Sequence, residues 1–162
     1  MITVVLSTLN SAEPLSRLLA ALTPAAVDGL VRDVVLLDRG STDATFELAE
    51  DAGASALRGG SLGDALNIAR GEWLLWLPAD AGLDAGWRAA LEAHLALADQ
   101  EPARIVPATE RLFARLRGRR VKAGWLAPKR LVATASAGPV EAYLQRLPHG
   151  RRIRRLRLLA AQ

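Results

Sequence analysis

The sequence contains no cysteine, which excludes disulfide bonds and metal sites built on thiolates. Its two histidines, His94 and His149, are too few for a metal site made of imidazoles. No apolar stretch approaches the roughly 20 residues that a membrane-spanning helix needs, and nothing near Met1 resembles a cleaved signal peptide. These absences predict a cytoplasmic protein. A length of 162 residues with 51% hydrophobic composition suits one domain with a sizeable core.

Basic residues are scarce in the first part of the chain, and acidic residues are scarce in the last part. Residues 1–103 carry six arginines, no lysine and fifteen acids, a net charge of −9. Residues 104–162 carry fifteen arginines and lysines against two acids, a net charge of +13. This asymmetry is typical of a C-terminal segment that contacts an anionic partner or covers the acidic part. A solvated basic face is an equally good interpretation.

Two anionic partners can be weighed for the basic segment. Peripheral contact with an anionic membrane, at the inner membrane face, would gain about 1 kcal/mol per Lys or Arg near the surface. The tail at 151–162 has few aromatic residues and only a modest apolar face, so it would not anchor the protein alone. Nucleic acid is the weaker candidate, because no stacking platform or known motif accompanies the basic residues.

Apolar runs and helical periodicities alternate over the first hundred residues. Strands are expected at 2–6, 33–37, 54–57 and 72–77. Helices are expected at 13–22, ending before Pro24, and at 43–52, 62–70 and 84–99. Alternation with short loops implies parallel pairing, right-handed crossovers and the strand order 3-2-1-4. The predicted fold is therefore α/β, with a mainly parallel sheet between two layers of helices.

The pattern changes after residue 103. Strands are expected at 103–106 and 121–126 and helices at 108–117 and 139–147, while residues 129–134 are ambiguous. The tail could be a basic edge strand, an amphipathic helix or a frayed end. We interpret residues 104–162 as a short α+β extension of the same domain.

Polar side chains follow three of the expected strands. Thr8 and Asn10 come after the first strand, Asp38 ends the second, and Asp80 follows the fourth. The carboxyl ends of parallel strands meet at one edge of the sheet, where ligands bind in open α/β folds. The sequence therefore predicts one cleft rimmed by these four residues.

The turn after Asp38 has an interpretation that needs no ligand. Ser41 and Thr42 are candidate N-caps of the next helix, and Asp43 would lie in its first turn, where negative charge suits the helix dipole. Every strand-to-helix unit needs a turn and a cap, so the pattern around Asp38 is consistent with structure alone as well as with ligand binding.

A glycine-rich loop, Arg58–Gly63, precedes the third expected helix. Such a loop can lay backbone N–H groups against phosphate, which makes Gly60 a candidate ligand-binding residue. The loop lacks the Lys-Ser/Thr ending of a P-loop and the order GxGxxG. A plain turn is the competing interpretation.

Three stretches together resemble the nucleotide-sugar-binding half of family 2 glycosyltransferases, which have the GT-A fold. The opening stretch ITVVLSTLNSAEPLSRLLAAL resembles the family's first strand, Pro-Thr-x-Asn loop and first helix, with Ser7 in place of the proline. The stretch VVLLDRGSTDAT is similar to the second strand and its Asp-x-Gly-Ser-x-Asp-x-Thr turn. The stretch ARGEWLLWLPAD is similar to the strand that ends in the metal-binding Asp-x-Asp. The matches occur in order and cover about 60% of the chain.

The resemblance implies a Rossmann-like three-layer α/β/α core and a specific set of ligands. Residues matching Ser7, Thr8 and Asp38 hold the base and ribose of a nucleotide sugar, usually linked to UDP or GDP. The residue matching Asp80 binds a divalent cation, Mn²⁺ or Mg²⁺, that holds the diphosphate. Residues 1–103 would then be the nucleotide-sugar half and residues 104–162 the acceptor side. Asn10 and Gly60 complete the candidate nucleotide-binding set.

Two departures from the family pattern leave the activity open. The first Asp of Asp-x-Asp is Pro78, which cannot bind metal. The acids beyond residue 103 are Glu110 and Glu141, and neither lies in a family motif that would mark a catalytic base. One hypothesis is a glycosyltransferase with an unknown acceptor and an unassigned catalytic residue. The alternative is a catalytically inactive module that binds a nucleotide or a partner.

Overall fold

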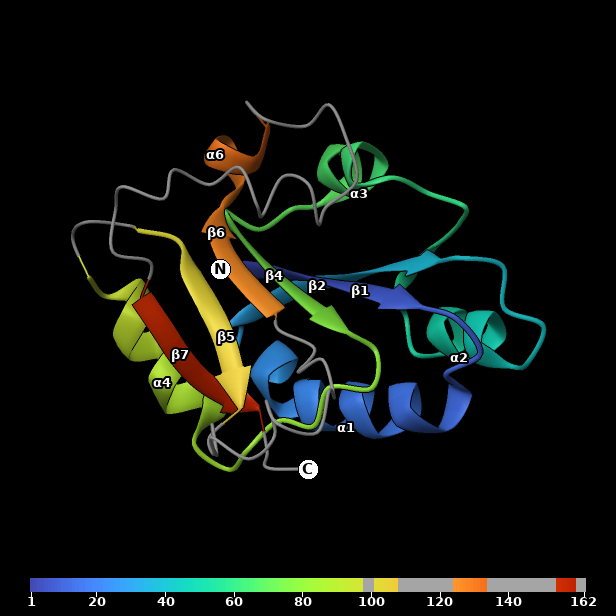
Figure 1. The fold of residues 1–162 in the computed structure, drawn as a ribbon, viewed down its shortest axis with the longest axis horizontal. Coiled ribbons are helices and arrows are strands. Elements are labelled where there is room, and N and C mark those ends of the chain that lie inside the picture. The colour runs from blue at the N-terminus through green and yellow to red at the C-terminus, as the bar shows by residue number, and fades with distance from the viewer. Residues whose placement is uncertain (98–100, 108–123, 134–153, 160–162) are drawn as a thin grey trace, which may run out of the picture.

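The computed structural model describes residues 1–97, 101–107, 124–133 and 154–159, and Figure 1 shows how their helices and strands are arranged. Strands and helices alternate along the chain as far as α4, as the sequence predicts. The elements in chain order are β1 (Ile2–Thr8), α1 (Ala12–Val27), β2 (Val31–Asp38), α2 (Thr45–Asp51), β3 (Ser55–Arg58), α3 (Leu62–Ile68), β4 (Trp73–Pro78), α4 (Trp87–Leu95), β5 (Ala103–Pro107), β6 (Gly124–Pro128), α6 (Lys129–Ala133) and β7 (Arg154–Leu159).

The described strands form one sheet in the order β3-β2-β1-β4-β6-β5-β7. The first four are parallel to their neighbours, which confirms the predicted order 3-2-1-4. Strand β6 is antiparallel to both β4 and β5, while β7 runs parallel to β5. The C-terminal part therefore extends the same sheet, and the tail includes a strand, one of the three alternatives open from the sequence.

Helices cover both faces of the sheet, also as predicted (Figure 1). Helices α1, α2 and α4 pack on one face, where the core contains Leu6, Leu36 and Leu77. Helices α3 and α6, at the top of Figure 1, pack on the other face with Val5 and Val35. Neighbouring residues of a strand point to opposite faces, so a central strand buried on both sides has a run of apolar and β-branched residues, as β1 has from Ile2 to Leu6.

Helix α1 is longer than the sequence pattern indicates. It continues through Pro24 to Val27, whereas the prediction ended it at Leu22. Proline removes one N–H from the helix but leaves its carbonyl in use, and the Asp28 N–H donates to the Pro24 carbonyl oxygen. The fully buried Ala25 continues the apolar stripe, and Gly29, with φ +77°, ends the helical region.

Other boundaries differ by a few residues. Helix α4 begins at Trp87 rather than 84, because Asp84 accepts the Gly86 N–H in a turn before the helix. The ambiguous stretch after residue 128 begins with the short helix α6. The helices predicted at 108–117 and 139–147 lie outside the described residues. None of the helices in the described part of the chain is long and apolar enough to cross a membrane.

A polar junction closes the amino edge of the sheet, opposite the predicted cleft. The Thr3 hydroxyl donates to Asp33 Oδ1 and accepts the Gly71 N–H at 2.8 Å. A Cβ on Gly71 would lie 2.4 Å from the Thr3 nitrogen and 2.5 Å from the Ile2 carbonyl carbon. The chain entering β4 can therefore approach β1 this closely only because residue 71 has no side chain.

Candidate functional site

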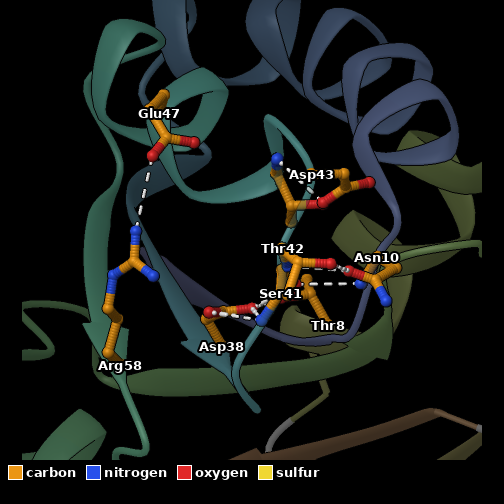
Figure 2. A network of polar contacts seen from close by, with 9 residues as sticks. Thr8, Asn10, Asp38, Ser41, Thr42, Asp43, Glu47 and Arg58 are labelled. Atoms are coloured by element: carbon orange, nitrogen blue, oxygen red, sulfur yellow. Dashed lines mark hydrogen bonds and ion pairs between the residues drawn. The ribbon is translucent and has the colours of Figure 1, made fainter.

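Thr8 and Asp38 lie side by side at the carboxyl ends of β1 and β2. The two residues are paired in the sheet register, and the Thr8 hydroxyl donates to Asp38 Oδ1 at 3.2 Å. Ser41 supplies two further donors, its hydroxyl at 2.5 Å and its backbone N–H at 3.1 Å, as Figure 2 shows. Asp38 is only 1% exposed, so these donors replace the water that its carboxylate loses on folding.

The electrostatics of Asp38 follow from this arrangement. Burial by itself raises the pKa of the carboxyl, but hydrogen bonds from Ser41, Thr8 and the Gly40 backbone outweigh it, so the pKa is lowered. Asp38 is therefore ionised at neutral pH. It places a fixed negative charge between two strand ends, a position suited to accepting hydrogen bonds from N–H or O–H groups.

Asn10 joins the loop after β1 to the loop after β2. Its backbone has φ +48°, a left-handed conformation that asparagine tolerates better than most residues. Its N–H donates to the Ser41 hydroxyl oxygen at 2.9 Å, and its side-chain oxygen accepts the Thr42 N–H at 2.9 Å (Figure 2). The predicted cap role of Ser41 and Thr42 is wrong: the N-cap of α2 is Ala44, and both residues bond to Asn10 in the loop after β1 instead.

Asp43 connects the beginnings of two helices. It lies before α2 rather than in its first turn, and its Oδ1 accepts the Thr45 hydroxyl and N–H. Its Oδ2 accepts the Ala12 N–H of α1 at 3.2 Å. The Thr45 hydroxyl bond is the main cause that lowers the pKa of Asp43. The sequence correctly indicated a carboxylate near the start of α2, but it did not indicate that the same carboxylate also bonds to the start of α1.

The end of β4 completes the same edge. Pro78 pairs with Ser7 in the register, and the Ala79 N–H donates to the Ser7 carbonyl oxygen at 3.2 Å. Asp80 follows in the turn and is partly exposed. Ser7 and Thr8 are consecutive in β1, so their side chains point to opposite faces of the sheet. Because β4 and β2 both run parallel to β1, Asp80 emerges at the same edge as Asp38, one strand beyond β1.

Gly60 lies where the chain passes from β3 to α3. A Cβ on this glycine would lie 2.7 Å from Leu57 Cβ, so close packing requires glycine here. Next to it, Ser61 and Asp64 form a capping box: the Asp64 N–H donates to Ser61 Oγ, and the Ser61 N–H donates to Asp64. These internal bonds use N–H groups at the start of α3, and binding of phosphate by Gly60 stays a prediction.

Arg58, at the end of β3, is a basic residue of this edge to which the sequence analysis assigned no role. Its guanidinium lies 4.1 Å from the centre of the Phe46 ring and forms an ion pair with Glu47 at 3.4 Å (Figure 2). The next residue, Gly59, donates its N–H to the Asp38 carbonyl oxygen at 2.7 Å. The sequence signal that could have identified Arg58 was its position at the end of a strand, because Arg58 is paired in register with Asp38.

The donor set restricts how a cation could be held. No group of three or more His, Cys, Asp or Glu side chains that could hold a metal gathers among the described residues. Asp80 supplies a hard oxygen ligand, but Pro78 supplies none. Mg²⁺ characteristically binds through one or two carboxylates together with substrate phosphates. The single carboxylate after β4, that of Asp80, fits a cation shared with a diphosphate, and it does not fit a cation site built from protein alone.

Comparison with solved structures identifies the fold as GT-A, the fold of a large class of glycosyltransferases. The matching structures include glucosyl-3-phosphoglycerate synthase from Mycobacterium tuberculosis. Its complex with UDP is 23% identical to this chain, with a TM-score of 0.62, and the match covers 82% of this chain. Another crystal structure of that enzyme is 22% identical, with a TM-score of 0.71, and the match covers 100% of this chain and 71% of the other.

These likenesses establish the fold and leave the activity to be tested. The chain spans 58% of the length of the enzyme in its UDP complex. Other structures of that enzyme contain Mn²⁺, UDP-glucose and phosphoglyceric acid, or Mg²⁺ and UDP. No protein-family model matches the sequence, and neither does any curated protein. Nothing in the comparisons supports the expected contact of the basic C-terminal part with an anionic membrane.

Proposed function

We propose that this protein binds a nucleotide-diphosphate sugar, linked to UDP or GDP, at the carboxyl edge of β1, β2 and β4, and transfers the sugar to an acceptor. One observation carries the proposal. Thr8 and Asp38 end two adjacent strands, and Asp80 follows the third, so polar groups converge at the edge where open α/β sheets bind ligands. The GT-A fold of the chain agrees with this assignment.

Each part of the ligand has residues suited to it. We assign the base and ribose to Ser7, Thr8, Asn10 and Asp38, because ionised Asp38 is an acceptor for the N–H groups of a base and the hydroxyls of a ribose. Gly60 is assigned to the same nucleotide, on the side of β3. The Asn10–Ser41–Thr42 bonds fix the two loops before any ligand arrives, so little ordering is needed on binding.

The diphosphate is assigned to the Asp80 side of the edge. Asp80 would hold a divalent cation, Mg²⁺ or Mn²⁺, together with the diphosphate oxygens. Such a cation neutralises the charge that grows on the departing nucleoside diphosphate. The turn after β4 orients Asp80, because Ala79 bonds to Ser7 and the Ala81 N–H donates to the Pro78 carbonyl oxygen at 3.0 Å. No residue is assigned as the catalytic base.

Calorimetric titration with UDP, GDP and UDP-glucose tests the binding step. The variant Asp38→Asn should lose most of the binding heat, and it keeps the shape of the side chain. Asp33→Asn is the matched control, because Asp33 lies on the same strand, also accepts a threonine hydroxyl from β1, and is located at the opposite edge. Binding that is equal in both variants and the wild type would remove Asp38 from the site. Absence of any nucleotide binding by the wild type would refute the proposal.

A binding module without catalysis is the second candidate. Pro78 favours it, because the position of the first Asp in Asp-x-Asp has no side-chain ligand. Release of UDP from UDP-glucose in the presence of Mn²⁺ distinguishes the two. Turnover that is lost in Asp80→Asn supports the transferase, whereas tight UDP binding without turnover supports the module.

A further inference from the structure

A row of large side chains crosses three neighbouring strands on the face of the sheet that carries α3 and α6. Trp76 of β4 is paired in register with Trp125 of β6, and Trp125 is paired with Arg104 of β5. We call Trp76, Trp125 and Arg104 the cross-strand row. Side chains directly opposite each other on adjacent strands lie about 5 Å apart at Cβ, so members of the row are in contact distance of their neighbours.

Alternation along the strands places all three on the same face. Trp76 and Trp125 pack beside the core of the α3 and α6 face. Ala103 and Ile105, on either side of Arg104, belong to the core of the opposite face. Arg104 therefore points away from that core and to the side of the two tryptophans.

The row is more open than the same face farther from the carboxyl edge. Leu74 and Ala127, the next pair on this face in the β4–β6 register, are buried, whereas Trp76 and Trp125 are partly exposed and Arg104 is exposed. No ion pair within the described residues engages Arg104. Trp76 Nε1 is buried and has no hydrogen-bond partner in the described part of the chain, which is unusual for a buried polar atom.

The chemistry of the row indicates one class of ligand. Indole faces attract sugar rings and other flat or apolar faces. A guanidinium binds carboxylate or phosphate through paired N–H donors. A ligand that satisfies the whole row has a ring for the tryptophans and an anionic group for the arginine.

We infer that the cross-strand row binds the acceptor substrate, and that this acceptor is a sugar-like ring bearing a phosphate or a carboxylate. The inference rests on the proposed function, because a ligand of the row is an acceptor only if the protein transfers a sugar. Trp76 lies two residues before Pro78, and two residues of a strand span about 7 Å. The row is thus beside the end of β4 where the nucleotide sugar is assigned, on the side of the sheet that β6 and β5 extend (Figure 1).

Intrinsic tryptophan fluorescence provides the test, because Trp73 and Trp87 are buried on the opposite face and serve as a constant background. Glucose 6-phosphate, glucuronate and glucose are titrated into the wild type, the first two separating a phosphate from a carboxylate. We expect the preferred anionic sugar to bind about tenfold more tightly than glucose, the size of one charge-assisted hydrogen bond.

Arg104→Gln should abolish this preference for an anionic sugar, and Trp125→Phe should weaken the binding of all three sugars. Arg32→Gln is the control, because it removes one exposed arginine of β2 far from the row and should leave the preference intact. An unchanged preference in Arg104→Gln, or equal binding of all three sugars by the wild type, would overturn the inference.

Calorimetry with UDP on the same variants separates this inference from the proposed function. If UDP binds normally to Arg104→Gln while the preference for an anionic sugar over glucose disappears, the nucleotide site and the acceptor surface are both supported. UDP binding without any Arg104-dependent preference refutes the acceptor surface and leaves the nucleotide site. An Arg104-dependent preference in a protein that binds no nucleotide refutes the nucleotide site, and the row is then an anionic-sugar site without a donor.

Discussion

Asp43 Oδ2 accepts the backbone N–H of Ala12 at 3.2 Å, so a side chain that precedes α2 provides a hydrogen-bond acceptor for an N–H group in the first turn of α1. The same carboxylate accepts two bonds from Thr45, the first residue of α2. One negative charge therefore lies at the amino ends of both helices, where their dipoles favour it. The two loops beside the candidate nucleotide site depend on this junction for their relative position.

Asp43→Asn should lower the urea midpoint at pH 7, because it removes the charge and exchanges one acceptor for an amide. The pKa of Asp43 is lowered in the folded protein, chiefly by the Thr45 hydroxyl. A lowered pKa adds stability that is present above the usual carboxyl value of 3.8 and is lost as the pH falls through the folded value. The difference between variant and wild type should therefore be largest near neutral pH and shrink below pH 3.8.

The control for this prediction is Asp51→Asn at the exposed end of α2. It removes the same charge from the same helix without touching α1, and its urea midpoint should not fall below that of the wild type. A loss in Asp51→Asn as large as that in Asp43→Asn would mean that net charge, and not the junction, is responsible.

Gly71→Ala should destabilise the fold by about 1–3 kcal/mol, the usual cost of forcing a methyl group into packed atoms. The atoms in its way are the Thr3 nitrogen and the Ile2 carbonyl carbon, which are backbone and cannot turn aside. Gly63→Ala, within α3, is the opposite case. Its nearest neighbour would be Ser61 Oγ at 3.5 Å, so it should gain up to about 1 kcal/mol of helix propensity. Denaturant unfolding of both variants measures the contrast, and equal stability would contradict it.

Mn²⁺ should increase the affinity of the wild type for UDP by about tenfold, or 1.4 kcal/mol, and Asp80→Asn should remove this increase while retaining the cation-free affinity. The reason is that Asp80 is assigned as the carboxylate that shares the cation with the diphosphate. Calorimetry with and without excess EDTA gives both values. If Asp80→Asn responds to Mn²⁺ as the wild type does, the assignment of Asp80 is incorrect.

Ser61→Ala should cost about 1 kcal/mol of unfolding free energy, because it deletes the Ser61 oxygen that accepts the Asp64 N–H at the start of α3. Ser55→Ala, at an exposed position of β3, makes the same chemical change without a cap and should be close to neutral. Comparing the two separates the capping box from the general effect of removing a hydroxyl.

The sheet was predictable because its signal is carried by composition over many residues. The run at Ile2–Leu6 is apolar or β-branched at every position, as expected of a strand buried on both faces, and its neighbours follow from the handedness of crossovers. The end of α1 was not predictable in this way. Pro24 is a helix breaker in isolation, and the helix continues past it with Ala25 buried in the core and the Asp28 N–H bonded to the Pro24 carbonyl oxygen.

The candidate site was predictable as a set of strand ends and not as a set of bonds. Asp38 and Thr8 could be placed together from the parallel order alone. The role of Ser41 could not, because its hydroxyl bonds to Asp38 behind it and to Asn10 on another loop, whereas local pattern suggests the helix ahead. Sequence periodicity reports neighbours along the chain, whereas the Thr8–Asp38 and Asn10–Ser41 bonds join residues about 30 positions apart.

The central position of β1 has a consequence for biosynthesis. Strand β1 is synthesised before both of its neighbours, β2 and β4, and the β4 residue paired with Ile2 is Trp73, 71 residues later. At about 5–20 residues per second, roughly 4–14 s of translation separate the two strands. During that interval one side of β1, a strand whose residues are almost all buried in the folded protein, has no partner, so a nascent chain that stalls before Trp73 should be a preferred client of ribosome-bound chaperones.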